Sequence, residues 1–167
     1  MEKKYLSITR EKLVSGELTP AEAVAQLYAA VELNAGYMNY LADIMLFAPE
    51  QIDVYAVSYY LAKVSEGGHE GFLFDAAGVL WREAIVGLDR IGAEEAAENL
   101  RSVRNKFPIE LPFELAERIS SVCENDLSFA EEDEVFGRLR GDIEELLKKY
   151  VADNAEAFEF EGEVEII

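Results

Sequence analysis

Apolar and polar positions recur with a helical period along most of this chain, and that period predicts its elements. The clearest stripe lies near the C-terminus and places these side chains on one helical face: Val135, Leu139, Ile143, Leu146, Leu147 and Tyr150. A second stripe follows Pro49 and comprises Ile52, Tyr55, Ala56, Tyr59, Tyr60 and Val64. These stripes predict an all-α fold, a single compact multi-helix domain that ends in a long acidic helix.

Helix-capping residues and glycines set the expected boundaries. We expect helices over 3–15, 20–33, 37–47, 49–66, 79–91, 93–107 and 113–123, followed by the acidic helix. Thr19 with Glu22 predicts a capping box, and Ser128 with Glu131 predicts a second one that opens the acidic helix. The pair Gly67-Gly68 is expected to end the helix that starts at Pro49.

The last ten residues have a different pattern. From Phe158 to Ile166, apolar and acidic side chains alternate with the period of a strand. This pattern fits either an edge strand or a loosely docked tail, and we favour the tail because termini fray and Gly162 weakens a strand. The expected division is an acidic helical domain over 1–157 and an acidic tail over 158–167.

The net charge of the chain limits the kinds of partner that it can bind. The net charge is −19, and residues 124–167 contribute −11 of it. Half of the residues are hydrophobic, which argues against a disordered polyanion. A folded protein with this net charge is repelled by nucleic acid and anionic membranes and attracted to basic proteins. The charged N-terminus and the single cysteine lead us to expect a cytoplasmic protein without a membrane span.

Residues that carry chemistry are few. His69 is the one histidine, and we expect it to cap a helix or fill a turn rather than act as a base. Cys123 lies among apolar residues, which predicts an inert buried thiol. The aromatic residues Tyr55, Tyr59, Tyr60, Phe72, Phe74 and Trp81 are interpreted as core rather than as a ligand pocket. We therefore expect no enzyme activity, no cofactor and no metal site.

The acids of the C-terminal helix are the candidate functional residues. An α-helix that exposes two carboxylates per 5.4 Å turn has a linear charge density comparable to that of one DNA strand. The candidate partner-binding residues are Glu131, Glu132, Asp133, Glu134, Asp142, Glu144, Glu145 and Asp153. The alternative is a solvated helix face supported by the ion pairs Glu144–Lys148 and Glu145–Lys149.

A run around the glycine pair carries a family resemblance. The segment Ser65–Gly78 (SEGGHEGFLFDAAG) resembles the bacterial DNA-mimic protein family, as do Glu83-Ala84, Ile91-Gly92-Ala93 and the region from Tyr5-Leu6 to Ala21–Val24. The resemblance covers about residues 5–125. It implies a small, acidic, all-helical homodimer that occupies the DNA-binding face of a helix-turn-helix repressor and relieves repression. A histone-like nucleoid protein is a second class of target.

Two other functions stay open from the sequence. An immunity-type inhibitor of a basic toxin nuclease would need the same acidity. A hydrolase would use His69 with Glu70 or Asp75 as its acid–base pair. The first alternative predicts that a captured partner loses catalysis, and the second predicts that replacing His69 abolishes an activity.

Overall fold

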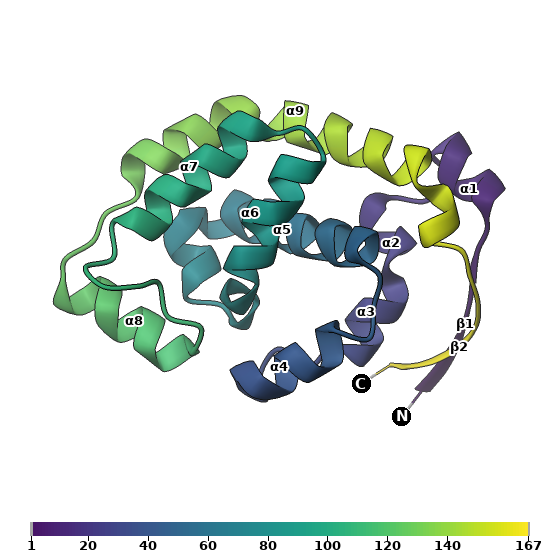
Figure 1. The fold of residues 1–167 in the computed structure, drawn as a ribbon, viewed down its shortest axis with the longest axis horizontal. Coiled ribbons are helices and arrows are strands. Elements are labelled where there is room, and N and C mark those ends of the chain that lie inside the picture. The colour runs from purple at the N-terminus through teal and green to yellow at the C-terminus, as the bar shows by residue number, and fades with distance from the viewer. Residues whose placement is uncertain (1, 167) are drawn as a thin grey trace.

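The chain folds into helices packed around one long helix, with a two-stranded ribbon that joins its two ends (Figure 1). The computed structural model describes residues 2–166. In chain order the elements are β1 (Glu2–Ile8), α1 (Arg10–Ser15), α2 (Pro20–Ala23), α3 (Ala25–Ala30), α4 (Tyr37–Ile44), α5 (Pro49–Leu73), the 3-10 helix η1 (Ala76–Leu80), α6 (Trp81–Arg90), α7 (Glu94–Asn105), α8 (Leu115–Glu124), α9 (Ala130–Asp153), the 3-10 helix η2 (Ala155–Ala157) and β2 (Phe160–Ile166). The expected mostly helical single domain is confirmed.

Helix α5 forms the centre of the fold. Pro49 occupies its first turn, where the missing N–H costs nothing, and the Ala48 N–H donates to Gln51 Oε1 at 3.0 Å. The side chains of Tyr55, Tyr60 and Phe72 are fully buried, so the expectation that the aromatic residues of this region belong to the core is confirmed. Their burial ties α5 to α6 and α9.

The glycine pair breaks α5 without ending it. Gly67 has φ −143° and Gly68 has φ 67° and ψ −173°, so two helical segments meet at an angle here. The predicted end of the first helical segment at this point is confirmed, and His69–Leu73 form a second, short segment directly after the break. Only glycine adopts the φ and ψ of Gly68 without strain.

The N-terminal half differs from prediction in three places. Residues 2–8 form a strand, and only Arg10–Ser15 are helical, with the Thr9 side chain as N-cap. The predicted helix over 20–33 is two short helices, because Val24 leaves the helical region with φ −120°. The predicted helix over 79–91 begins as the 3-10 helix η1. The Thr19–Glu22 capping box is present as expected.

The ribbon is formed by strands from opposite ends of the chain. β1 and β2 pair antiparallel, with Leu6 opposite Gly162 and Ile8 opposite Phe160. Leu6 and Ile8 are buried. The favoured loosely docked tail was therefore wrong for Phe160–Ile166: a paired strand partner, invisible in the local sequence, orders this segment.

A buried arginine holds the region between α5 and α8. Arg118 is fully buried, and its guanidinium donates to the carbonyl oxygens of Leu73 at 2.8 Å, Asp75 at 2.9 Å and Phe113. Burial lowers the pKa of Arg118 to about 10. Three carbonyl acceptors replace the water that a buried guanidinium loses, and the nearby Glu114 and Asp75 carboxylates offset part of the effect of burial on its pKa.

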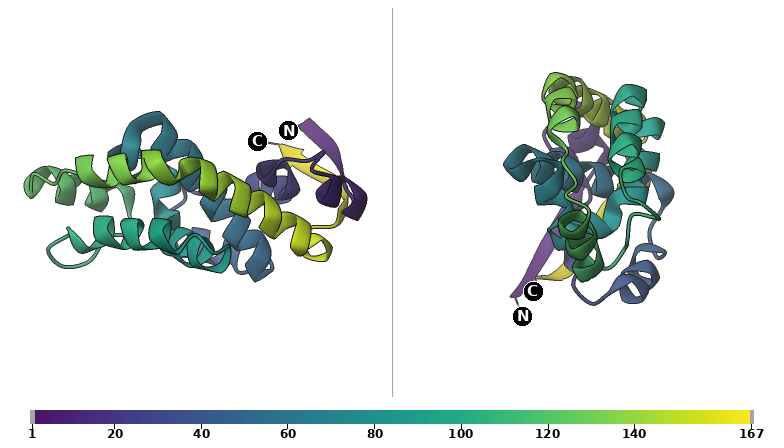
Figure 2. Two further views of the ribbon diagram at one scale, coloured as in Figure 1. Left: turned by 90° about the horizontal axis from the view of Figure 1, so that it is seen from above. Right: turned by 90° about the vertical axis from the view of Figure 1, so that its left-hand side faces the viewer.

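Two elements lie at opposite edges of the molecule. Helix α9 runs along one long side from the α8 end to the ribbon, as the left view of Figure 2 shows. Helix α4 lies at the opposite side in Figure 1. This arrangement leaves one face of α9 open along its length.

Candidate partner-binding surface

Helix α9 presents the acidic surface because its other face is anchored in the core. Phe136, Ile143, Leu147 and Val151 are buried, and the predicted stripe is confirmed at Ile143 and Leu147. The predicted capping box at Ser128 is absent: Phe129 occupies the N-cap position without a side-chain hydrogen bond. Acidic residues in the first turn instead face the positive end of the helix dipole.

Three of the predicted acids are free on this surface. Glu131, Glu134 and Asp142 are exposed, and none forms an ion pair with another residue in the range 2–166. They therefore carry uncompensated negative charge on an ordered helix.

Three further predicted acids are partly neutralised by neighbours on α9. Glu144 accepts from Arg140 Nε at 3.0 Å, and Glu145 accepts from Lys148 Nζ at 3.0 Å. Asp153 pairs with Lys149. The predicted pairing of Glu144 with Lys148 and of Glu145 with Lys149 is wrong, since each base bonds a different acid. Exposed pairs of this kind are worth less than about 1 kcal/mol and open readily to a partner.

Glu132 was predicted to lie on the acidic surface and does not. Its side chain is 4% exposed, and it accepts hydrogen bonds from Lys106 Nζ at 2.7 Å and Ser102 Oγ at 2.9 Å. Burial opposes its ionisation, but the bonds from Lys106 and Ser102 outweigh that effect and lower the pKa of Glu132. Glu132 thus joins α9 to α7 as an internal ion pair.

Asp133 holds the break in α5. One of its oxygens, Oδ1, accepts from the His69 backbone N–H at 2.8 Å and lies 2.6 Å from His69 Nδ1. On the other side of the ring, His69 Nε2 lies 2.9 Å from the Tyr60 hydroxyl. An ionised carboxylate only accepts, so Nδ1 carries the proton and Nε2 accepts from Tyr60.

This geometry gives His69 a structural role. The ring is fully buried, and both of its nitrogens are engaged. Burial lowers the pKa of His69, and Asp133 offsets only part of that effect. The acid–base pair of the hydrolase hypothesis is not assembled: Glu70 is exposed, and Asp75 pairs with Lys63 at 2.9 Å. His69 was expected to cap a helix or fill a turn, but it starts the second helical segment of α5 with its ring in the core.

Two glycines on the open face of α9 were not noticed in the sequence. Gly137 and Gly141 are one turn apart in the helix, both are exposed, and a Cβ at either position would meet nothing within 4 Å. Each costs about 1 kcal/mol relative to alanine in a helix interior, with no internal packing to explain it. They leave a smooth strip of backbone between the flanking acids.

Other residues relevant to this surface depend on the fold. Glu70 is exposed and directly follows His69, whose backbone N–H donates to Asp133 in the first turn of α9. Cys123, predicted to be buried, is exposed, because Val122 takes the core position at the end of α8. No local sequence pattern distinguishes the buried Val122 from the exposed Cys123.

Metal and membrane sites were also sought. Among residues 2–166, no three His, Cys, Asp or Glu side chains are placed to hold a metal ion. No helix in the same range is long and apolar enough to cross a bilayer.

Comparison with known families places this surface in context. The model of the DMP19-like protein family matches residues 45–154, which run from the turn before α5 to the end of α9. The chain belongs to the DMP19-like family. DMP19 is a family of DNA-mimic proteins and not of enzymes. No curated protein and no solved structure matches the chain.

The family match covers part of the predicted resemblance. Ser65–Gly78, Glu83-Ala84 and Ile91–Ala93 fall inside the matched residues, whereas Tyr5–Val24 lies outside them. The match also includes α9, which lies beyond residues 5–125, the predicted extent of the resemblance. Helix α9 is therefore part of the region that matches the family model.

Proposed function

We propose that this protein binds a basic DNA-binding protein through the open face of α9 and keeps that protein from DNA. The partner is a helix-turn-helix repressor or a histone-like nucleoid protein. The observation that carries the proposal is the set of free carboxylates, Glu131, Glu134 and Asp142, on an ordered helix of a DNA-mimic family member. A fixed row of carboxylates offers a cationic protein the contacts that it otherwise makes with phosphates.

The rigidity of α9 supports mimicry rather than simple acidity. The Glu132–Lys106 pair and the Asp133–His69 bond fix the first turn of α9 to α7 and α5. Carboxylates held in place lose little conformational entropy when a partner binds. The exposed strip at Gly137 and Gly141 would let a partner helix approach the α9 backbone closely.

We also propose that the protein forms a homodimer through α4. Met38 is 72% exposed, Met45 72% and Leu46 81%. Between Leu33 and Pro49 the chain has a single charged residue, although 29% of the whole chain is charged. Two copies of a protein with net charge −19 can meet only where charge is sparse, and dimer interfaces are depleted of charge. Because α4 lies across the molecule from α9, the open face of α9 stays accessible in both copies of the dimer (Figure 1).

The test is affinity capture from a lysate of the source cell, followed by a challenge with excess duplex DNA. The proposal predicts that a basic DNA-binding protein is retained and that DNA displaces it. Retention of a nuclease whose cleavage activity is blocked would favour the immunity-type inhibitor instead. If nothing basic is retained at low salt, the proposed function is wrong.

A further inference from the structure

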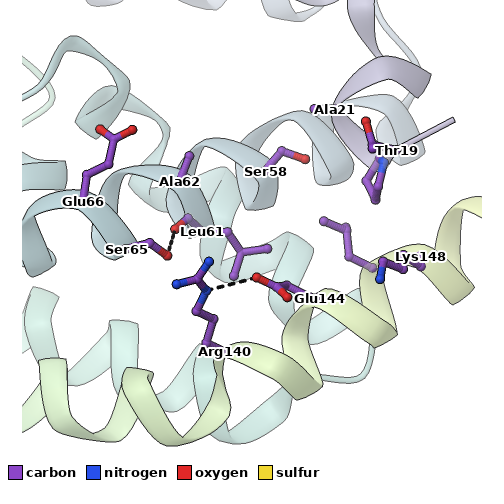
Figure 3. A pocket seen from close by; sticks show the side chains of 12 residues that line it. Thr19, Ala21, Ser58, Leu61, Ala62, Ser65, Glu66, Arg140, Glu144 and Lys148 are labelled. Carbon is purple, nitrogen blue, oxygen red and sulfur yellow. Dashed lines mark hydrogen bonds and ion pairs between the residues drawn. The ribbon is translucent and has the colours of Figure 1, made fainter.

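A groove on the flank of α9 has the size of a small-molecule site. It lies between α2, α5 and α9 and has a volume of about 450 Å³ (Figure 3). Ligand sites commonly occupy about 300 to 1,000 Å³ and combine apolar walls with a few polar groups. Its lining comes from Thr19, Pro20 and Ala21 of the α2 start, from Ser58, Leu61, Ala62, Ser65 and Glu66 of α5, and from Arg140, Glu144, Leu147 and Lys148 of α9.

The walls of the groove are mainly apolar. The apolar lining residues are Leu61 and Ala62 of α5, Leu147 of α9, and Pro20 and Ala21 at the start of α2. An aliphatic group bound here would lose its contact with water, and so would the apolar wall that it covers.

Two opposite charges stand side by side on the α9 wall. Arg140 Nε donates to Glu144 Oε1 at 3.0 Å, and the Arg140 side chain extends from α9 toward Leu61 and Ser65 (Figure 3). Its two terminal nitrogens donate to no acceptor in the part of the chain that the structure describes. Glu144 Oε2 likewise receives no donor there. The pair thus retains free donors and a free acceptor next to an apolar wall.

The other charges of the groove are engaged outside it. Lys148 bonds Glu145 at 3.0 Å, and Glu66 lies 3.8 Å from Lys63. A free anion would be repelled by a chain of net charge −19, and a free cation would find many other carboxylates. A net-neutral ligand with both charges close together avoids the first problem and matches the Arg140–Glu144 pair.

We propose that this groove binds a free α-amino acid with an apolar side chain. The ligand carboxylate accepts from the terminal nitrogens of Arg140, which present donors in a planar fork suited to carboxylates. The ligand ammonium donates to Glu144 Oε2. The aliphatic side chain lies on Leu61, Ala62 and Leu147. This site does not depend on the partner proposed for the open face of α9.

The experiment titrates the purified ¹⁵N-labelled protein with L-leucine and follows backbone amide shifts at Leu61, Ala62 and Glu144. Three probes each remove one feature of leucine: 4-methylpentanoate lacks the ammonium, 3-methylbutylamine lacks the carboxylate, and glycine lacks the apolar group. Each lost hydrogen-bonded charge or buried side chain is expected to weaken binding at least about tenfold. Equal binding by any of the three probes would overturn the assignment.

Variants on the same helix locate the site. Arg140→Gln and Glu144→Gln are each expected to weaken leucine binding at least about tenfold, since each removes one charged contact. Arg138→Gln is the matched control, because Arg138 is an exposed arginine of α9 that faces Glu95 at 3.8 Å and lines no part of the groove. Equal loss in Arg138→Gln, or leucine shifts confined to other elements, would contradict the proposal.

Discussion

Asp133 Oδ1 lies 2.6 Å from His69 Nδ1 and 2.8 Å from the backbone nitrogen of the same residue. One carboxylate therefore caps the second segment of α5 and fixes the tautomer of its buried histidine. The same residue stands in the first turn of the acidic helix, two positions from Glu131. This contact thus links the break in α5 to the first turn of the helix that carries the candidate surface.

Removing this carboxylate should destabilise the fold. Asp133→Ala leaves the His69 N–H groups without an acceptor in a buried site, and each orphaned donor costs about 1–3 kcal/mol. We expect the free energy of unfolding to fall by about 2–4 kcal/mol in urea denaturation. Glu134→Ala, at the exposed neighbouring position, should change it by less than about 0.5 kcal/mol. Equal losses in the two variants would contradict the capping role.

A pair of adjacent glycines tests the same contact by geometry. A Cβ on Gly68 would lie 2.6 Å from Asp133 Oδ2, and this residue has φ 67°. Gly67 has φ −143° and nothing within 4 Å of a built Cβ. Gly68→Ala should lower the free energy of unfolding by about 1–3 kcal/mol, which lowers the melting temperature by several degrees. Gly67→Ala should have little effect on either quantity. A larger loss of stability in Gly67→Ala than in Gly68→Ala would contradict the assignment of the left-handed position to Gly68.

The histidine should make stability depend on pH. Burial holds the pKa of His69 below its value of about 6.5 in the unfolded chain, so the unfolded state binds more protons between these two values. The free energy of unfolding should therefore fall as the pH drops from about 7.5 through 6.5 toward the lowered pKa of the folded state.

The contribution of His69 to the pH dependence of stability can be isolated by comparing the wild type with a variant that lacks the histidine. Asp53 and Glu83 have pKa values raised by burial, so their contribution has the opposite sign at lower pH. His69→Gln keeps both of these carboxyls and removes the one histidine. The fall near pH 6.5 should be absent from this variant. A variant that follows the wild-type curve would exclude His69 as its source.

The sequence predicted the helical class and the core well, because both depend on local period. It failed where the partner of a residue is distant. Residues 3–8 were predicted as helix because nothing local reveals that they pair with residues 160–165. Strand pairing between the chain ends follows from the tertiary fold alone.

The candidate surface was predicted at the level of the helix but not of the residue. Glu131 and Glu134 are free, whereas Glu132 and Asp133 between them serve the interior. Four consecutive acids on a helix point in four directions about 100° apart, so some of them must face the core. Which of them do so depends on where Lys106 and His69 lie, and the sequence does not place those residues.

The two glycines of α9 should separate stability from binding. Gly137→Ala and Gly141→Ala should each raise the free energy of unfolding by about 0.5–1 kcal/mol, because alanine favours the helix and no neighbour opposes the new methyl group. If a partner lies close to this strip, the same variants should weaken its binding. Stabilisation together with unchanged partner affinity would show that the strip is not a contact.

The measurement that tests the central claim most directly is the affinity of the captured DNA-binding protein for a triple variant, across a range of salt concentrations. Glu131→Gln, Glu134→Gln and Asp142→Asn remove three free charges of α9, and the control removes three exposed charges elsewhere, at Glu11, Glu17 and Glu110. The account predicts at least about a tenfold loss and a flatter salt dependence for the α9 variant, with the control close to wild type. Equal affinities of the two variants would contradict a partner-binding role for the acidic face of α9.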